Sequence, residues 1–376
     1  MKPLRIIKAV FCVALVCLLL TGCQERENLK DLSVVEGIGI DYANGQVGIT
    51  AQTLNLMKEG TGAEALSGNI TMVSSGQADN ISSAVENVSQ RLSKKLYFAQ
   101  NRIVVFGMDY AENHLKESFD YLLRSTNSRP DVFVCISSGE AKAVIESEEA
   151  NSLVPAQTIS DLLEEGEKRG TSVTVTVNEL LNYYTDKTSD IYMPVVEAGE
   201  ENVSATGIAV FDGDKLVRVL EGDECTGFMI LSGKIKDGII VFNVDGFGQV
   251  TAEITKIKTK TKAYYENGRV VLRADIKADI ILDEVENGLQ NSISKEEANK
   301  IARTAEKKIQ QLCEVAFKAC TESSSDCLRI GEMLAKYDPS AYKILSENKN
   351  AYLSSCTLEI NASCDLKKIS DNSNGS

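Results

Sequence analysis

The chain has 376 residues, of which 40 are Lys or Arg and 54 are Asp or Glu, so its formal net charge is −14. This acidic balance argues against a nucleic-acid-binding protein, because phosphate backbones are contacted by basic surfaces. With 43% hydrophobic and 25% charged residues, the composition is typical of a globular protein that can bury sizeable cores. Length alone predicts two or three domains.

The N-terminus has the pattern of a secretory signal peptide, predicted over residues 1–22. Lys2, Arg5 and Lys8 make a positive start, and the apolar run that follows is well short of the ~20 residues that span a bilayer. Removing this signal lowers the net charge from −14 to −17, because it carries those three positive residues and no acidic one. So acidic a body is not expected to be held at anionic lipid by charge.

The signal ends in Leu20-Thr21-Gly22-Cys23, which resembles the lipobox of bacterial lipoproteins. In that family the cysteine thiol receives a diacylglycerol, the signal is removed before the cysteine, and the new amino group is often acylated. The resemblance implies lipidation of Cys23, export, and tethering to a membrane through acyl chains such as palmitate. An ordinary cleaved signal followed by a chance cysteine is the alternative.

The region from the signal to residue 198 mixes strands with helices. Val34 to Asp41 and Gly45 to Leu56 predict a strand pair around Asn44-Gly45, a strong hairpin dipeptide. Apolar runs predict buried strands at 101–107 and 131–137. Helices are predicted at 79–96, 110–125, 139–149, 158–168 and 176–184, and a loop at 60–69. This alternation predicts an N-terminal α/β domain over residues 23–198.

Segment 197–204 is small and polar, which predicts a linker between domains. Beyond it, 207–211 and 215–220 flank Asp212-Gly213-Asp214 and predict a hairpin. A further apolar strand is predicted at 238–244. Together these predict a small middle β-rich domain over residues 205–250.

The C-terminal third alternates in polarity. Residues 270–282 and 356–366 predict two half-buried strands with one wet face. Between them, Ser294 and Glu297 predict a capping box that starts a helix over 295–320, whose apolar stripe is expected to cover the sheet. We predict a C-terminal α+β domain at 251–369 and a disordered tail at 370–376. The whole is expected to be a multidomain α+β protein with mixed or antiparallel sheets, each covered by helices.

A search for catalytic constellations returns almost nothing. His114 is the only histidine, which excludes multi-histidine metal sites, and its acidic neighbours predict a solvated helix face. Gly37-Ile38-Gly39 lacks the third glycine and the following helix of a phosphate loop. We therefore predict no catalytic residue, no cofactor, no metal site and no enzymatic activity.

Seven cysteines follow Cys23, an odd number that cannot all pair within the chain: Cys135, Cys225, Cys313, Cys320, Cys327, Cys356 and Cys364. Cys313 and Cys320 would lie ~10.5 Å apart along a helix, beyond the ~7 Å that a disulfide spans. Cys356 and Cys364, eight residues apart on one strand, are farther still. Buried free thiols are predicted, and a three-thiolate zinc site at Cys313, Cys320 and Cys327 is the alternative.

Lys256, Lys258, Lys260 and Lys262 form a basic stripe on one face of a predicted strand. Lysines of this kind protect an edge strand from pairing with another chain. Contact with acidic groups of a partner or a headgroup is the alternative.

Short motifs in a fixed order cover nearly the whole mature chain. They are Gly37-Ile38-Gly39-Ile40-Asp41, Lys95 to Gly107, Phe119 to Pro130, Gly207 to Phe211, Asp214 to Leu216, Thr226-Gly227, Gly233 to Gly238 and Arg329 to Leu334. In this order they resemble the Ger(x)C family of spore-germination lipoproteins, the C subunits of nutrient germinant receptors. The chain departs from the family pattern at Gln24-Glu25, where Trp-Asp is frequent, and at Ala99-Gln100, where the family has Ser-His.

This resemblance implies a non-enzymatic subunit on the outer face of the spore inner membrane. It would assemble with two polytopic subunits, A and B, and be needed for the response to small nutrients. The resemblance also implies three α/β-type domains built around mixed or antiparallel sheets. A solute-binding lipoprotein of a transporter is the alternative, although the chain has no tryptophan to stack on a ligand and its halves differ. A membrane-anchored hydrolase fits worst, because the histidines that such enzymes use are missing.

Overall fold

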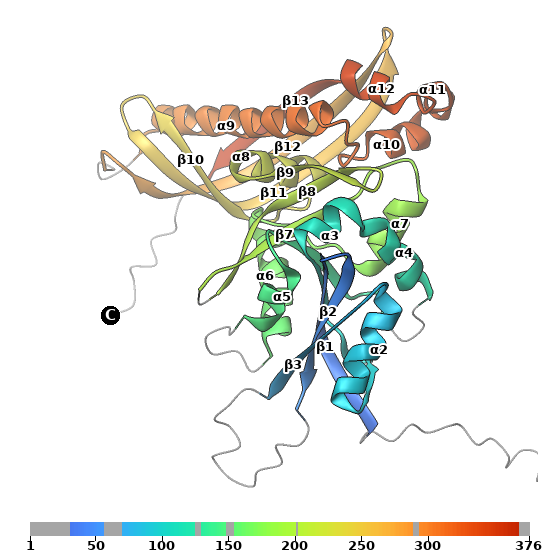
Figure 1. Cartoon of the computed structure of the whole chain (residues 1–376). Helices are drawn as coiled ribbons and strands as arrows, with labels where there is room; N and C mark the ends of the chain where they lie inside the picture. Colours follow the sequence, from blue (N-terminus) through green and yellow to red (C-terminus); the bar gives the residue numbers. More distant parts are fainter. Residues whose placement is uncertain are drawn as a thin grey trace, which may run out of the picture.

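The computed structural model describes residues 31–55, 70–124, 129–147, 154–200, 202–288 and 293–367. Within these ranges the strands form two sheets with helices packed against them, which confirms the predicted α+β class (Figure 1). The predicted signal 1–22, the loop 60–69 and the tail 370–376 lie outside the described residues. No helix in the described part of the chain is long and apolar enough to cross a membrane.

The first sheet is mixed and has the order β3-β2-β1-β5-β6-β7-β8-β9, with β4 paired beside the start of β1. Its strands are β1 (Leu32–Ala43), β2 (Gln46–Leu54), β3 (Thr71–Ala78), β4 (Lys95–Tyr97), β5 (Ile103–Phe106), β6 (Phe133–Ser137), β7 (Tyr192–Ala198), β8 (Val203–Asp212) and β9 (Lys215–Leu220). β1, β5, β6 and β7 are parallel neighbours in the centre, and antiparallel strands complete both margins. The central strands are apolar on both faces because helices cover both.

Helices lie on each face of the first sheet. One face carries α2 (Ile81–Leu92), α3 (Met108–Asn113), α4 (Leu115–Arg124) and α7 (Val177–Thr185), and the other carries α5 (Ala141–Glu146) and α6 (Pro155–Arg169). Neighbouring residues of β5 point into different cores: Val104 faces the first group of helices, and Val105 packs with α5 and α6. A short 3-10 helix, η3 (Phe98–Gln100), connects β4 to β5.

The second sheet has the order β10-β11-β12-β13, with β13 parallel to β12. Its strands are β10 (Gly238–Val244), β11 (Gly248–Glu266), β12 (Arg269–Val285) and β13 (Thr357–Leu366). The long helix α9 (Lys295–Glu322) covers one face, begun by the predicted capping box of Ser294 and Glu297. α8 (Gly222–Ser232) packs against α9, and α10 (Ile330–Tyr337), α11 (Pro339–Leu345) and α12 (Lys349–Ser355) connect α9 to β13.

The Gly37-to-Asp41 motif has a structural explanation. A Cβ on Gly37 would lie 2.8 Å from the Ala156 Cβ, and one on Gly39 would lie 3.2 Å from Ala141, so α5 and α6 rest directly on β1. The Asp41 carboxylate then accepts hydrogen bonds from the Ala141 and Lys142 backbone N–H groups (2.7 and 2.9 Å) at the start of α5. The motif therefore joins β1 to the helices on one face of the sheet.

The predicted hairpin around Asn44-Gly45 is confirmed. Asn44 and Gly45 have φ of 54° and 79°, as a two-residue type I′ turn requires, and β1 pairs with β2 on either side. The predicted helix 79–96 is shorter than expected. It ends at Leu92 because Ser93 adopts a left-handed φ of 51°, and the chain turns into β4.

Two predictions made from local sequence are wrong. The single helix expected over 110–125 is two helices, since His114 has non-helical φ and ψ of −132° and 3°. The linker expected over 197–204 is the turn of a hairpin: the Gly199 N–H donates to the Asn202 carbonyl (2.8 Å), and β7 pairs with β8. Small polar residues suit a tight turn as well as a linker, so composition alone did not distinguish the two.

Segment 205–250, predicted as a middle domain, supplies strands to both sheets. Its hairpin, β8 and β9, lies in the first sheet, and β10 lies in the second. The described residues thus form two sheets, where the family resemblance implied three domains. The domain limits at 198, 205, 250 and 251 stay a prediction.

Candidate functional site

The two sheets are joined by a polar group that we call the junction cluster: Asp190, Asp212, Asp326, Lys349 and Tyr352. Asp190 and Asp212 come from the first sheet and its loops, while the other three come from the helical connection that follows α9. Lys349 donates from Nζ to Asp190 Oδ2 (2.7 Å) and to Asp212 Oδ1 (2.5 Å). This lysine, at the start of α12, therefore links two carboxylates of the first sheet to the second part of the chain.

Asp326 is the fully buried centre of the junction cluster. Its side chain accepts hydrogen bonds from the Ile330 N–H, the Gly331 N–H and the Tyr352 hydroxyl, each at 2.7 Å. Its own N–H donates to Asp190 Oδ2 (2.7 Å). Burial raises the pKa of Asp326 to about 7, against the opposing effect of these hydrogen bonds.

A cavity of about 300 Å³ opens beside the junction cluster. Lys349, Asp190 and Asp212 line it, together with Tyr183 and Tyr184 of α7. Three of the charged residues that line it, Lys349, Asp190 and Asp212, are already paired with one another in the junction cluster. The arrangement holds two parts of the chain together and contains no evident nucleophile–base pair.

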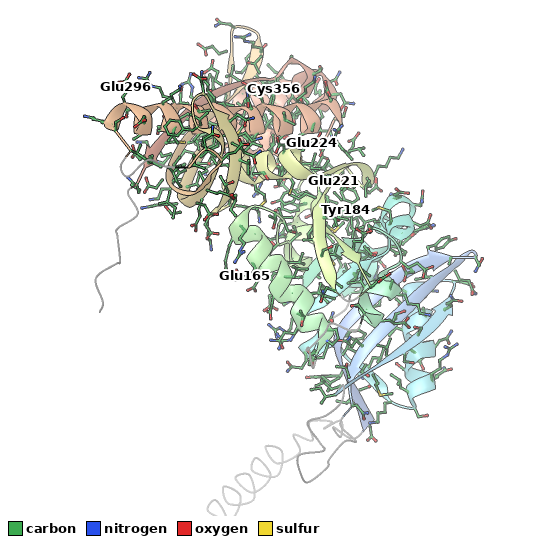
Figure 2. The ribbon with its side chains drawn as sticks, turned by 90° about the vertical axis from the view of Figure 1, so that its left-hand side faces the viewer. Glu165, Tyr184, Glu221, Glu224, Glu296 and Cys356 are labelled. Atoms are coloured by element: carbon green, nitrogen blue, oxygen red, sulfur yellow. The ribbon has the colours of Figure 1, made fainter. Side chains whose placement is uncertain are left out.

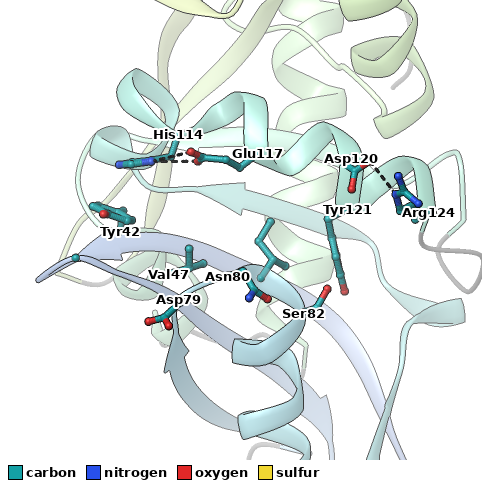
Figure 3. Close-up of a pocket in the computed structure, with 12 residues that line it drawn as sticks. Tyr42, Val47, Asp79, Asn80, Ser82, His114, Glu117, Asp120, Tyr121 and Arg124 are labelled. Carbon is teal, nitrogen blue, oxygen red and sulfur yellow. Dashed lines mark hydrogen bonds and ion pairs between the residues drawn. The ribbon is translucent and has the colours of Figure 1, made fainter.

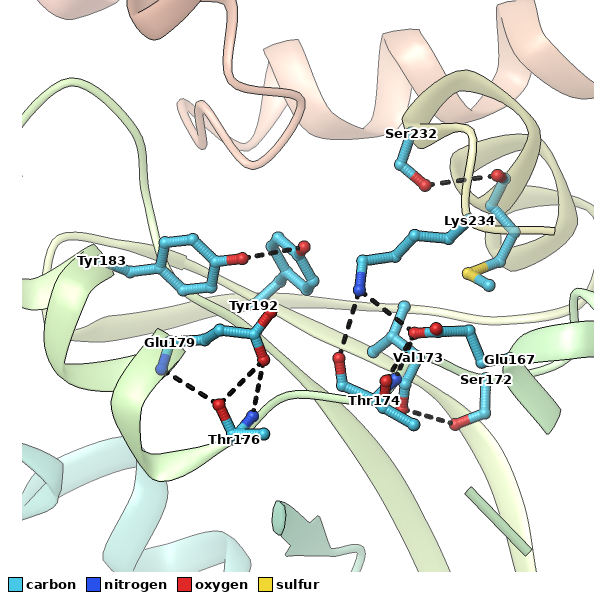
Figure 4. A network of polar contacts seen from close by, with 11 residues as sticks. Glu167, Ser172, Val173, Thr174, Thr176, Glu179, Tyr183, Tyr192, Ser232 and Lys234 are labelled. Atoms are coloured by element: carbon cyan, nitrogen blue, oxygen red, sulfur yellow. Dashed lines mark hydrogen bonds and ion pairs between the residues drawn. The ribbon is translucent and has the colours of Figure 1, made fainter. Parts of the chain in front are cut away.

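A second link joins α6 to the segment after α8 (Figure 4). Lys234 Nζ donates to Glu167 Oε2 (3.1 Å) and to the Thr174 carbonyl (3.2 Å), while Glu167 also accepts from the Thr174 N–H (2.7 Å). Burial opposes ionisation of Glu167, but its hydrogen bonds and the charge of Lys234 lower the pKa. Figure 2 shows Glu221 and Glu224 where the first sheet passes into α8.

His114 lines a cavity of about 440 Å³ at the end of the β1–β2 hairpin (Figure 3). Its ring stacks on Tyr42, with centroids 3.7 Å apart, and its Nδ1 lies 3.1 Å from Glu117 Oε2. Among the described residues, no hydroxyl or thiol is hydrogen-bonded to this ring. His114 was expected on a solvated helix face; it lies between two helices, where the stack with Tyr42 leaves its side chain 23% exposed.

All seven body cysteines are free and buried, as predicted. Burial raises the pKa of Cys225, Cys313, Cys356 and Cys364 to about 12, so their thiolates are scarce at neutral pH. A hydrogen bond with Cys327, together with burial, raises the pKa of Cys320 well above its ordinary value. Across the described ranges, no group of three or more His, Cys, Asp or Glu side chains is placed to hold a metal ion.

The lysine stripe lies on the open face of β11. Lys256, Lys258, Lys260 and Lys262 are exposed, and β10 pairs with β11 only as far as Ile254. From Lys256 onward β12 is the partner of β11 within the described sheets, which supports the predicted edge-protecting role. Contact of the stripe with a partner stays an alternative.

Cys23, the predicted lipid-bearing residue, lies outside the described residues. The described chain begins at Asp31, directly before β1. The junction cluster, in contrast, was missed by sequence reasoning. Its members are spread from residue 190 to residue 352, so no local spacing could bring them together.

Comparison with known proteins matches both parts of the chain. Residues 25–198 match the family model described as "Spore germination protein N-terminal domain", and residues 206–370 match "Spore germination B3/ GerAC like, C-terminal". The chain is 26% identical over 300 residues to spore germination protein B3 of Bacillus subtilis (strain 168), covering 78% of this chain and 79% of that one. It is 24% identical to spore germination protein KC of the same organism, covering 93% of each.

The fold is shared with a solved structure. The crystal structure of the GerBC protein aligns with a TM-score of 0.59 at 17% identity, over 88% of this chain and 97% of that chain. The two sheets and the helices between them therefore define a protein of the GerBC fold. The chain belongs to the Ger(x)C family of spore germination proteins.

Proposed function

We propose that this protein is a non-enzymatic lipoprotein subunit of a nutrient germinant receptor, needed for receptor assembly and signalling in spore germination. Acyl chains on Cys23 hold it at the outer face of the spore inner membrane, and polytopic A and B subunits are its partners. The observation that carries the proposal is the lipobox that ends at Cys23, placed directly before the two germination-family regions.

A non-enzymatic role is supported by the geometry of the candidate groups. His114 is engaged with Tyr42 and Glu117. The body thiols are buried, and the raised pKa values of Cys225 and Cys313 keep these two protonated at neutral pH. These groups build the fold, and none is presented to a substrate as an activated nucleophile.

Replacing Cys23 by alanine tests the anchoring. Cys23→Ala removes the only acyl-accepting thiol of the lipobox, so we expect the protein to leave the membrane fraction and the nutrient response of spores to be lost. The readouts are immunoblots of membrane and soluble spore fractions and the loss of optical density after nutrient addition.

Cys17→Ala is the matched control, because it makes the same change six residues earlier within the predicted signal. It should leave both readouts unchanged. Normal germination with a fully released Cys23→Ala protein would contradict the proposal. Co-purification of the A and B subunits with a tagged wild-type chain, and not with Cys23→Ala, tests the predicted partners.

A further inference from the structure

One stretch of this acidic chain carries no acidic residue. From residue 87 to residue 108 it contains Arg91, Lys94, Lys95 and Arg102, and neither Asp nor Glu. The formal net charge of the whole chain is −14, so this local excess of positive charge runs against the composition. The stretch includes the end of α2, β4, η3 and β5.

The fold places these basic residues around the first residues of β1. β4 pairs with β1 in parallel, which sets Lys95 beside Leu32 and Tyr97 beside Val34. Arg91, in the last turn of α2, donates from Nη1 to the Ser75 carbonyl of β3 (2.6 Å). We call Arg91, Lys94, Lys95 and Tyr97, together with Met72 and Val73 of β3, the basic tip.

Large apolar side chains are exposed at the basic tip. Met72, Val73 and Tyr97 are 41%, 37% and 37% exposed. Met72 of β3 pairs with Thr53 of β2, and Thr53 pairs in turn with Val35 of β1. Met72 therefore lies at the end of the sheet where β1 begins. Basic side chains mixed with an exposed tyrosine and aliphatic groups are typical of surfaces that rest on a bilayer.

The chain leading from the predicted anchor arrives at this end of the molecule. Leu32 is nine residues after Cys23, and an extended chain spans about 3.4 Å per residue, so the two are at most about 30 Å apart. Figure 1 shows α2 and the start of β1 at one end, and the second sheet with α9 at the other. The basic tip lies at the end where β1 begins, so a lipid on Cys23 would keep this end, and not the second sheet, near the membrane.

We propose that the basic tip docks on a bilayer surface that contains anionic lipid. Arg91, Lys94 and Lys95 lie among the phosphate headgroups, and Tyr97, Met72 and Val73 lie at the interface. This contact adds to the acyl anchor of the proposed function and orients the body, with the second sheet directed away from the membrane. Charge complementarity favours anionic lipid as the occupant, because juxtamembrane basic residues are attracted within about one Debye length.

The chain has no tryptophan, so a single introduced tryptophan reports on its own surroundings. Tyr97→Trp probes the basic tip, and Tyr265→Trp is the matched control, since Tyr265 is 43% exposed on the second sheet. Each acylated variant is reconstituted into vesicles of phosphatidylglycerol and brominated phosphatidylcholine. We expect blue-shifted, bromine-quenched emission from Tyr97→Trp alone. Quenching of neither variant, or of Tyr265→Trp instead, would overturn the proposal.

A charge variant tests the headgroup contact without the acyl anchor. The mature chain with Cys23→Ala is mixed with phosphatidylglycerol vesicles, and bound protein is measured by sedimentation. Lys94→Gln/Lys95→Gln should lower the partition coefficient about tenfold or more, whereas Lys256→Gln/Lys258→Gln on the second sheet should leave it nearly unchanged. Vesicles of phosphatidylcholine alone should bind none of these three proteins.

The outcomes separate the two proposals. If Cys23→Ala is released from spores and impairs germination while the vesicle results are negative, the proposed function stands and the basic tip is not a lipid surface. If Tyr97→Trp is shielded only in spore membranes that contain the A and B subunits, the tip contacts protein, which contradicts this inference. If the basic tip binds vesicles but spores with Cys23→Ala germinate normally, the lipid-binding surface is supported and the proposed function is wrong.

Discussion

Asp326 shows how one carboxylate organises the junction between the sheets. It accepts hydrogen bonds from the Ile330 and Gly331 N–H groups of α10 and from the Tyr352 hydroxyl of α12. Its backbone N–H donates to Asp190 on the other side of the junction. A Cβ on Gly331 would lie 2.6 Å from the Thr188 carbonyl, so the chain approaches the first sheet closely here. No sequence pattern predicts that Asp326 and Gly331 meet Asp190 and Thr188, because the two pairs of residues are more than a hundred residues apart in the chain.

The raised pKa of Asp326 predicts a pH-dependent stability. Its pKa is about 7 in the folded protein and 3.8 in an ordinary setting, so the folded state keeps a proton that the unfolded chain has lost. The stabilisation is full below about pH 4 and is lost as the pH rises through 7. Asp326→Asn removes this titration and should flatten the fall in the urea midpoint between about pH 4 and about pH 7.

The same variant should be less stable by about 1–3 kcal/mol at low pH, since an amide cannot serve all three donors. Asp245→Asn is the control, because the side chain of Asp245 is 98% exposed. An unchanged pH dependence in Asp326→Asn would show that another group carries it.

At the scale of elements, α8 was missed by sequence reasoning because its buried residues from Gly227 to Leu231 follow one another and so face every side of the helix. Phe228 contacts Tyr192 of β7, and Gly227 lies against the Leu312 carbonyl of α9. A run of buried residues on all sides leaves no helical stripe to detect, and the acidic residues Asp223 and Glu224 lie only in the first turn. In contrast, α9 has one solvent-exposed face, and the apolar stripe on its other face correctly predicted the helix.

Gly227→Ala should separate α8 from α9. The added methyl group would overlap the Leu312 carbonyl, a backbone atom that cannot rotate away. We expect a loss of at least about 2–3 kcal/mol in unfolding free energy, measured by urea denaturation. Gly139→Ala, where an added Cβ meets nothing within 4 Å, should change stability by less than about 0.5 kcal/mol. Equal stability of the two variants would contradict the close crossing.

At the scale of the whole molecule, the β8–β9 hairpin ties the two family regions together. The N-terminal family match ends at residue 198, yet β7 pairs in antiparallel with β8, most of which lies within the C-terminal match. Tyr192, Met193 and Val195 of β7 are buried. A cut at the sequence boundary would therefore expose an apolar strand edge.

Two fragments test this. Residues 31–200 should aggregate, because β7 has lost its partner, whereas residues 31–221 keep the complete first sheet and should stay more soluble. Light scattering and hydrogen exchange in β7 measure the difference. Equal solubility and equal protection of β7 would indicate that the hairpin is dispensable and that the predicted boundary is a structural one.

Elements with a strong local pattern could be predicted. The Asn44-Gly45 turn needs positive φ values, α9 has a capping box and a stripe, and β12 alternates in polarity along its length. His114 illustrates the opposite case. Its neighbours predict an uninterrupted helix, but stacking on Tyr42, far away in sequence, accompanies a break there.

By itself the sequence determined the family, the α+β class and the burial of the thiols, because each depends on residues close together or on an order of motifs along the chain. Tertiary structure alone decided which strands share a sheet, how Asp326 and Lys349 join the two parts, and where positive charge gathers. Net charge sums over the whole chain, whereas a membrane or a partner meets only the residues that folding brings to one surface. The basic tip therefore became visible only when β4 was placed beside β1.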